Sequence, residues 1–196
     1  MVWWEGVLVG LAVGAALSII LHVLITGTPP MPTLARERRA ILAALPEAAA
    51  APFPESPLRD GLPHDGPLME LGGGWGALAL ALAERYPERT VHAFERSPLP
   101  WAVCRLRALC MSRNLIVHRR DFFQADLSPA ALVTCYLSPH LMVKLAPKLE
   151  KELRPGSMVI SNTFAIPGWR AQSTIPTGGW FGGPILVYVA DSERPT

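Results

Sequence analysis

The stretch Leu68-Met69-Glu70-Leu71-Gly72-Gly73-Gly74-Trp75-Gly76 decides the fold of this 196-residue chain. Its first residues are typical of a short buried strand, and its glycines predict a tight loop. The Ala- and Leu-rich residues 77–84 then predict a helix. Glycine lets the backbone approach a ligand closely, and the free N–H groups at a helix N-terminus attract polar groups. The stretch therefore predicts a strand, a loop and a helix that together cradle a polar ligand.

An acidic residue follows at the spacing that such a cradle needs. Residues 89–95 predict a second buried strand that ends in Glu95, roughly twenty residues after the glycine loop, where α/β nucleotide sites place a carboxylate. That carboxylate accepts hydrogen bonds from the two hydroxyls of a ribose. Glu95 is therefore a candidate ribose ligand.

The rest of the chain predicts an α/β fold with a Rossmann-like sheet. Residues 132–137 are apolar throughout, as is typical of a central strand in a parallel sheet. The C-terminal part has no room for a long helix and predicts a closing antiparallel hairpin. The expected strands after the second are residues 115–118, 132–137, 157–161 and 184–189, and the expected helices are residues 97–113 and 141–153.

The substrate pocket is expected where the fourth strand ends, because ligands of open α/β sheets bind at the carboxyl ends of the strands. The residues at this place are Tyr136, Leu137, Ser138 and Pro139. Trp169 and Trp180 fit two alternatives, packing under a glycine-rich loop or forming walls of the substrate channel.

The N-terminus predicts a membrane anchor in residues 1–28. No Asp, Glu, Lys or Arg occurs from Gly6 to Ile25, and about 20 apolar residues suffice to cross a bilayer. A cleaved signal peptide would need a basic start and an Ala-x-Ala exit, and the chain has neither. We expect one uncleaved transmembrane helix.

The basic residues next to this span predict its orientation. Arg36, Arg38 and Arg39 follow it, whereas its N-terminal side has no basic side chain. Because basic residues favour the cytoplasmic side, we expect a single-pass protein of the inner (cytoplasmic) membrane with its catalytic domain in the cytoplasm.

A Pro-rich connector, residues 29–63, joins the anchor to the domain of residues 64–196. Thr33 is the expected N-cap of a helix over residues 34–45, whose apolar residues recur at helical spacing. This helix either packs on the domain or lies on the lipid surface, and the sequence leaves both open.

Composition excludes several kinds of site. The net charge of +2 is too small to indicate a nucleic-acid partner. Three cysteines without CxxC spacing predict reduced, buried thiols, and five scattered histidines predict no metal site.

The motifs together resemble a known family. Glu-x-Gly-x-Gly-x-Gly at residues 70–76 resembles motif I of the class I S-adenosylmethionine (SAM) methyltransferases. The segments at residues 30–33, 121–127, 136–142 and 164–169 resemble the small membrane-anchored protein-lysine methyltransferases related to the ATP synthase c-subunit and adenine nucleotide translocase enzymes. The chain departs from motif I at Trp75, where a smaller or acidic residue is commoner.

The resemblance implies a cofactor, a set of ligands and a substrate class. S-adenosyl-L-methionine would be the cofactor, with its ribose at Glu95 and its adenine at Asp121 and Phe122. The other alternative for Asp121 is a helix or turn cap. The methyl acceptor would be a lysine of an integral membrane protein, in a pocket lined by Tyr136, Leu137, Ser138, Pro139 and Trp169. The implied cofactor-binding residues are Glu70, Gly72, Gly73, Gly74, Gly76, Glu95, Arg96, Asp121 and Phe122.

Three other functions remain open at this stage, and no residue is identifiable as the catalytic base. A lipid or small-molecule methyltransferase also suits a membrane anchor. A non-catalytic SAM-binding scaffold would need no base. The spacing of Gly72, Gly74 and Ala77 also satisfies a dinucleotide fingerprint, which is typical of an NAD-dependent oxidoreductase.

Overall fold

The sheet is the centre of the structure, which is a computed structural model. It describes residues 3–10, 13–14, 33–45, 62, 64–178 and 182–190. Within them seven strands form one sheet in the order β3-β2-β1-β4-β5-β7-β6. The strands are β1 (Leu68–Leu71), β2 (Val91–Phe94), β3 (Leu115–His118), β4 (Leu132–Cys135), β5 (Met158–Asn162), β6 (Ser173–Ile175) and β7 (Ile185–Val189). The helices are α2 (Ala35–Ala44), α3 (Ala77–Arg85), α4 (Pro98–Met111) and α5 (Pro139–Glu152), with the 3-10 turn η1 (Phe122–Gln124).

The first five strands run parallel, and the last two close the sheet in the antiparallel sense. Strand β1 lies between β2 and β4, and all four of its residues are buried. Leu71 is in register with Phe94, and Phe94 with His118. The chain therefore leaves β1, β2 and β3 at the same edge of the sheet.

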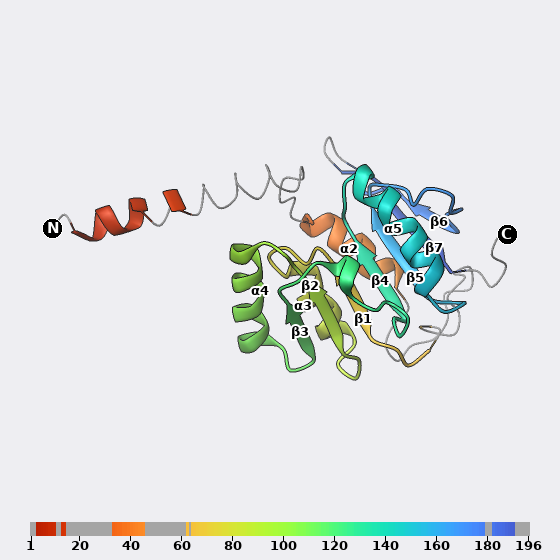
Figure 1. Cartoon of the computed structure of the whole chain (residues 1–196), viewed down its shortest axis with the longest axis horizontal. Helices are drawn as coiled ribbons and strands as arrows, with labels where there is room; N and C mark the ends of the chain where they lie inside the picture. Colours follow the sequence, from red (N-terminus) through yellow and green to blue (C-terminus); the bar gives the residue numbers. More distant parts are fainter. Residues whose placement is uncertain are drawn as a thin grey trace.

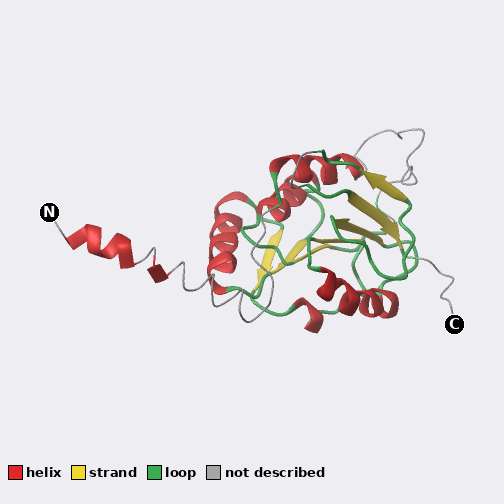
Figure 2. Cartoon of the chain, turned by 90° about the horizontal axis from the view of Figure 1, so that it is seen from above, coloured by secondary structure: helices red, strands yellow, loops and turns green. Residues whose placement is uncertain are grey.

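Helices cover both faces of the sheet (Figures 1 and 2). On one face α2, α3 and α4 bury residues such as Ile41, Leu82 and Cys104 in a single apolar cluster. On the other face α5 buries Met142 and Leu145 in a second cluster. Burial on both faces explains why the parallel strands lack an alternating polar pattern.

The Rossmann-like sheet and its C-terminal antiparallel pair are confirmed. Strand β7 pairs antiparallel with both β5 and β6. The main difference concerns α5, which begins at Pro139 rather than at residue 141. Proline has no N–H to lose and its backbone angle suits the first position of a helix.

The connector helix α2 packs on the domain, which settles the alternative left open by the sequence. Ile41 and Leu45 are buried in the same cluster as α3 and α4. The prediction that Thr33 is the N-cap was wrong. The cap is Leu34, whose side chain has no polar group, and its N–H donates to Glu37 Oε2 at 3.0 Å.

The predicted membrane span lies largely outside the described residues. Its residues 11–12 and 15–25 are not described, whereas residues 3–10 and 13–14 are helical. None of the helices within the described ranges is long and apolar enough to cross a membrane.

All three cysteines are free, as expected. The prediction that all are buried was wrong for Cys110, which is exposed on α4, while Cys104 and Cys135 are buried.

Candidate functional site

The glycine loop is tied to the end of β2 by backbone hydrogen bonds. Gly72 N and Gly73 N both donate to Phe94 O at 2.9 Å. Gly72, Gly74 and Gly76 have φ angles of 80°, 51° and 79°, in the left-handed region that glycine enters without a Cβ penalty. At Gly76 a Cβ would also lie only 2.5 Å from Cys104 Sγ, so close packing on α4 requires glycine there.

Glu95 lies against this loop, as the spacing predicted. Its Oε2 accepts a hydrogen bond from Gly74 N at 2.8 Å, and its Oε1 accepts one from Ser97 N at 2.7 Å. Each carboxylate oxygen has two lone pairs, so one on each oxygen remains for a further donor. The side chain is buried, with 8% of its surface exposed. This geometry suits a carboxylate that accepts from a ribose diol while it holds the loop.

Glu70 lies beneath the loop and is incompletely paired. Its Oε2 is buried without a hydrogen-bond partner, and it would be 3.7 Å from a Cβ at Gly73. The pKa of Glu70 is raised from 4.5 to about 8, chiefly by burial. A hydrogen bond from the backbone N–H of Ala79 lowers this pKa, and the charge of Glu95 raises it. A buried oxygen without a partner is costly, and a cationic or hydrogen-bonding group at the loop would complete its pairing.

Asp121 caps the turn that follows β3. Its Oδ1 accepts from Phe123 N at 3.0 Å, and its Oδ2 lies 4.0 Å from Arg96 Nη1. The capping alternative is thus present in the structure. The adenine role of Asp121, Phe122 and Arg96 stays a prediction, and the structure places all three next to the edge at which Glu95 lies.

Trp75 and α4 meet at the start of α3. The carbonyl of Trp75 accepts from Arg107 Nη1 at 2.7 Å, and its side chain is half-buried. This bond links the glycine loop to α4, the helix that begins just after Glu95.

The residues predicted to line the substrate pocket, 136–139, lie next to the glycine loop, and we call this part of the molecule the substrate side. A Cβ at Gly72 would lie 3.4 Å from Leu137 Cδ2, so the segment after β4 touches the glycine loop. The Tyr136 ring stacks on Phe164 at 6.3 Å between centroids, and Ser138 and Pro139 begin α5. Burial raises the pKa of Tyr136, a hydrogen bond with Thr163 lowers it, and the charge of Glu37 raises it.

Trp169 lies apart from the other residues predicted to bind the substrate. Its Nε1 donates to Glu150 Oε1 at 3.1 Å, and its ring packs edge-on against Tyr188 at 6.1 Å. Glu150 is close to the C-terminal end of α5, whereas Tyr136 and Ser138 are at the N-terminal end. These contacts match the packing alternative for Trp169. Trp180 lies outside the described residues.

A buried polar group that was not predicted from the sequence joins α2 to the residues next to Tyr136. Glu37 is 1% exposed, and its Oε2 accepts from Asn162 Nδ2 at 3.1 Å across 125 residues of sequence. Asn162 Oδ1 in turn accepts from Thr163 Oγ1 at 3.0 Å. The spacing of the sequence does contain a sign that Glu37 is buried. Glu37 is four residues before Ile41, which is buried, so the two side chains lie on the same face of the helix.

Thr163 has an unusual backbone conformation at this junction. Its φ is 71°, which is uncommon for a residue with a branched Cβ. Its N–H donates to Pro184 O at 2.8 Å, which holds it there. Strain of this kind clusters at functional sites.

Among the described residues no group of three His, Cys, Asp or Glu side chains could hold a metal ion.

Comparisons with known proteins agree with this geometry. Residues 70–173 match the family profile of the ANTKMT methyltransferase domain. A protein-lysine N-methyltransferase of Saccharolobus islandicus (strain REY15A) is 28% identical over 158 residues, which cover 76% of this chain and 98% of that protein. The adenine nucleotide translocase lysine N-methyltransferase of Mus musculus is 31% identical over 116 residues, 58% of this chain; the match spans half the length of the mouse protein.

The solved structure of a similar protein indicates which cofactor this fold binds. The chain is similar to an RNA methyltransferase from Salinibacter ruber in complex with S-adenosyl-L-homocysteine, with a TM-score of 0.65 and 25% identity over 85% of this chain and 96% of that one. S-adenosyl-L-homocysteine is SAM without its transferred methyl group. SAM is therefore the cofactor that suits the loop, Glu95 and the unpaired oxygen of Glu70.

We expect Glu95→Ala to abolish SAM binding that calorimetry can measure. The substitution removes the predicted ribose ligand and also the acceptor of the Gly74 N–H. Glu88→Ala, at an exposed site, is the control and should bind as the wild type does. Wild-type affinity in Glu95→Ala would contradict the assignment of Glu95.

We expect Glu70→Gln to flatten the pH dependence of stability. The protonated Glu70 is favoured in the folded state, so its contribution is fully present below pH 4.5 and is lost as pH rises towards 8. Between these values the wild-type free energy of unfolding should fall, relative to the variant, by at most about 1.4 kcal/mol per pH unit. Urea unfolding of the cofactor-free protein at several pH values measures the difference. A difference that does not change with pH would contradict the raised pKa.

We expect Glu37→Leu to cost about 1–3 kcal/mol of stability, because it leaves the buried Asn162 amide without its partner. Glu37→Gln keeps an acceptor oxygen and should cost less. The double variant Glu37→Leu/Asn162→Leu should recover part of the loss, since neither partner is then left unpaired. Strictly additive losses in urea unfolding would show that the two side chains are not coupled.

Proposed function

This chain belongs to the ANTKMT methyltransferase domain family, and on that premise we propose that it methylates a lysine side chain of a membrane protein from a membrane-anchored position. The observation on which the proposal mainly depends is the hydrogen bond between Glu95 and Gly74. That bond holds the candidate ribose ligand against the glycine loop, and both lie inside the matched residues 70–173.

The protein's part in the reaction is mainly to hold two substrates in line. Bound SAM supplies a methyl group already activated by its sulfonium. Proximity and orientation supply up to about 7–11 kcal/mol of the acceleration in favourable systems. The loop and Glu95 would fix the donor, and the contact between Leu137 and Gly72 sets the substrate side against it. The proton that the amine loses on methylation passes to solvent in this scheme.

A lysine acceptor fits the rim of the substrate side. The stacked rings of Tyr136 and Phe164 offer aromatic faces, which attract an alkylammonium group and pack along its methylenes. The two relatives named above are both lysine N-methyltransferases. These observations favour lysine over a lipid head group or a small molecule as the acceptor.

Membrane anchoring is supported by the N-terminal residues. On the helical residues 3–10 and 13–14 the large apolar side chains are exposed: Trp3, Trp4, Val7, Leu8, Val9 and Val13. A Cβ at Gly6, Gly10 or Gly14 would meet no atom within 4 Å. Large exposed apolar surfaces mark contact with a membrane or another protein. With the uncharged run of residues 6–25, this favours insertion in a bilayer, with Arg36, Arg38 and Arg39 and the catalytic domain on the cytoplasmic side.

We expect the full chain to transfer labelled methyl groups to protein when it is incubated with membranes and labelled SAM. The label should appear in a gel band whose digestion yields methylated lysine by mass spectrometry. Glu95→Ala should leave the band unlabelled. Label that moves into the organic extract would instead identify a lipid acceptor and contradict the lysine assignment.

A further inference from the structure

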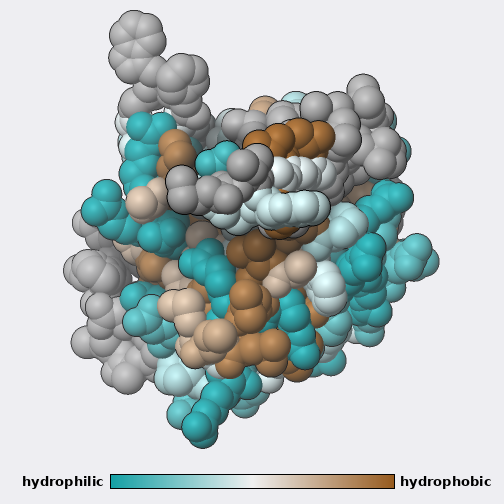
Figure 3. All heavy atoms as spheres, turned by 90° about the vertical axis from the view of Figure 1, so that its left-hand side faces the viewer, coloured by the Kyte–Doolittle hydropathy of each residue, from teal (hydrophilic) through white to brown (hydrophobic). Residues whose placement is uncertain are grey.

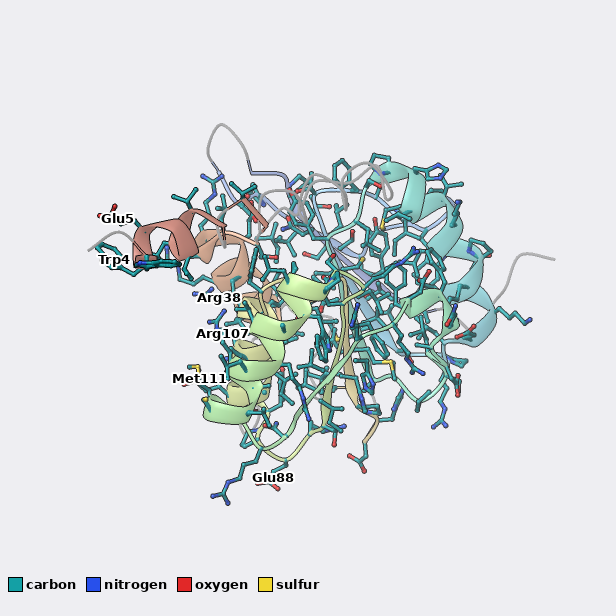
Figure 4. The ribbon with its side chains drawn as sticks, turned by 60° about the vertical axis from the view of Figure 1, so that its left-hand side comes forward. Trp4, Glu5, Arg38, Glu88, Arg107 and Met111 are labelled. Carbon is teal, nitrogen blue, oxygen red and sulfur yellow. The ribbon has the colours of Figure 1, made fainter. Side chains whose placement is uncertain are left out.

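The outer face of α4 is apolar although it faces away from the core. Leu106 and Leu109 are 63% and 67% exposed, whereas Cys104 and Ala108 on the inner face are buried. Figure 3 shows hydrophobic atoms gathered among hydrophilic ones on this side of the molecule, and Figure 4 shows α4 at the surface of the domain, with Arg107 and Met111 along it. We call Leu106 and Leu109, which are three residues apart and so share one side of the helix, the α4 face. A folded domain gains nothing by exposing two neighbouring leucine side chains.

Basic residues are concentrated in the part of the chain that contains α4. Residues 96–120 contain six arginines and no Lys, Asp or Glu, although the whole chain has a net charge of only +2. The six are Arg96, Arg105, Arg107, Arg113, Arg119 and Arg120. Within the described ranges Arg96 alone of these has an acidic partner, at 4.0 Å. Arg105 and Arg113 are exposed and belong to α4 and to the residues just after it. Arg105 and Arg113 therefore put two exposed basic groups, without an acidic partner in the described part of the chain, next to the α4 face.

Arginines next to exposed leucines suit an anionic lipid surface best. Helices that lie in a membrane interface have this composition, with basic groups at the head groups and apolar groups at the acyl boundary. Nucleic acid would pair with the arginines but would leave Leu106 and Leu109 in water. A second copy across a two-fold axis would bring Arg105 and Arg113 close to their own counterparts.

The position of α4 in the fold agrees with a lipid contact. Helices α2, α3 and α4 share one face of the sheet, and the chain enters that layer from the N-terminal segment through α2. The helical residues 3–10 extend from the molecule on the side where α4 lies (Figures 1 and 2). An anchor in the bilayer would hold this side of the domain near the lipid.

We propose that the α4 face, with Arg105 and Arg113, lies on the anionic lipid surface of the membrane that the N-terminal segment enters. This inference rests on the membrane anchoring proposed above and adds a second contact to it. Helix α4 begins three residues after Glu95, so a lipid contact along α4 fixes the orientation of the catalytic edge relative to the bilayer. The enzyme would then reach only those lysines that lie at a fixed distance from the membrane surface.

The chain's own cysteine allows a direct test. Cys110 is exposed beside Leu109, whereas burial raises the pKa values of Cys104 and Cys135 to about 12, so these two thiols stay protonated at neutral pH. The test measures the rate at which a polyethylene-glycol maleimide modifies Cys110 in the full chain on phosphatidylcholine vesicles with and without phosphatidylglycerol. We expect a severalfold slower reaction on the anionic vesicles, and a return to the faster rate in high salt.

Charge variants decide whether α4 makes the contact. Arg105→Glu/Arg113→Glu should remove the slowing on anionic vesicles. Lys144→Glu/Lys151→Glu makes the same change in charge on exposed residues of α5, across the sheet, and should keep the slowing. Equal effects of the two pairs would show a general charge effect and overturn the proposal.

Flotation of the same samples separates this proposal from the anchoring itself. If the protein floats with both kinds of vesicle and Cys110 reacts at the same rate on both, the α4 contact is overturned and the anchor stands. Protein that floats only with anionic vesicles, with Cys110 shielded, supports the α4 contact and contradicts the anchor. An RNA oligonucleotide that shields Cys110 without lipid would overturn the choice of lipid as the partner.

Discussion

The hydrogen bond from Gly74 N to Glu95 Oε2 is the constraint on which the rest of the site depends. It joins the loop after β1 to the residue after β2, and it pairs a backbone N–H with a buried carboxyl oxygen, so that neither group is left without a partner. The two bonds to Phe94 O fix the same loop from the backbone side. Their geometry requires the observed register of β1 and β2, because a slip of one residue would turn each side chain to the other face.

A second constraint acts on the substrate side and comes from outside the matched family region. Glu37 of the connector helix is buried and bonded to Asn162 at the end of β5. Asn162 and Thr163 lie beside Tyr136, so α2 takes part in shaping this rim. Helix α2 therefore belongs to the folded domain, even though the sequence places it between the proposed anchor and the sheet.

These two constraints and the proposed lipid contact combine in one arrangement. Helix α2 brings the chain from the N-terminal segment, and α4 lies in the same layer of helices. Arg107 of α4 is bonded to the carbonyl of Trp75 in the loop region. A domain held at α2 and α4 would thus present its catalytic edge to the bilayer in one orientation, which would make the position of a lysine part of its selection.

The sequence alone determined the sheet, the glycine loop, the place of Glu95 and the closing hairpin. These features follow from short stretches whose own residues encode them: apolar runs, glycines and a fixed spacing between two strands. Only the tertiary structure decided that Glu37, which stands among arginines, is buried, that Asp121 caps a turn, that Trp169 packs beside Glu150, and that Cys110 is exposed. Burial and pairing of such side chains depend on residues far away in the chain, as Asn162 is from Glu37, and those contacts exist only after the helices have packed on the sheet.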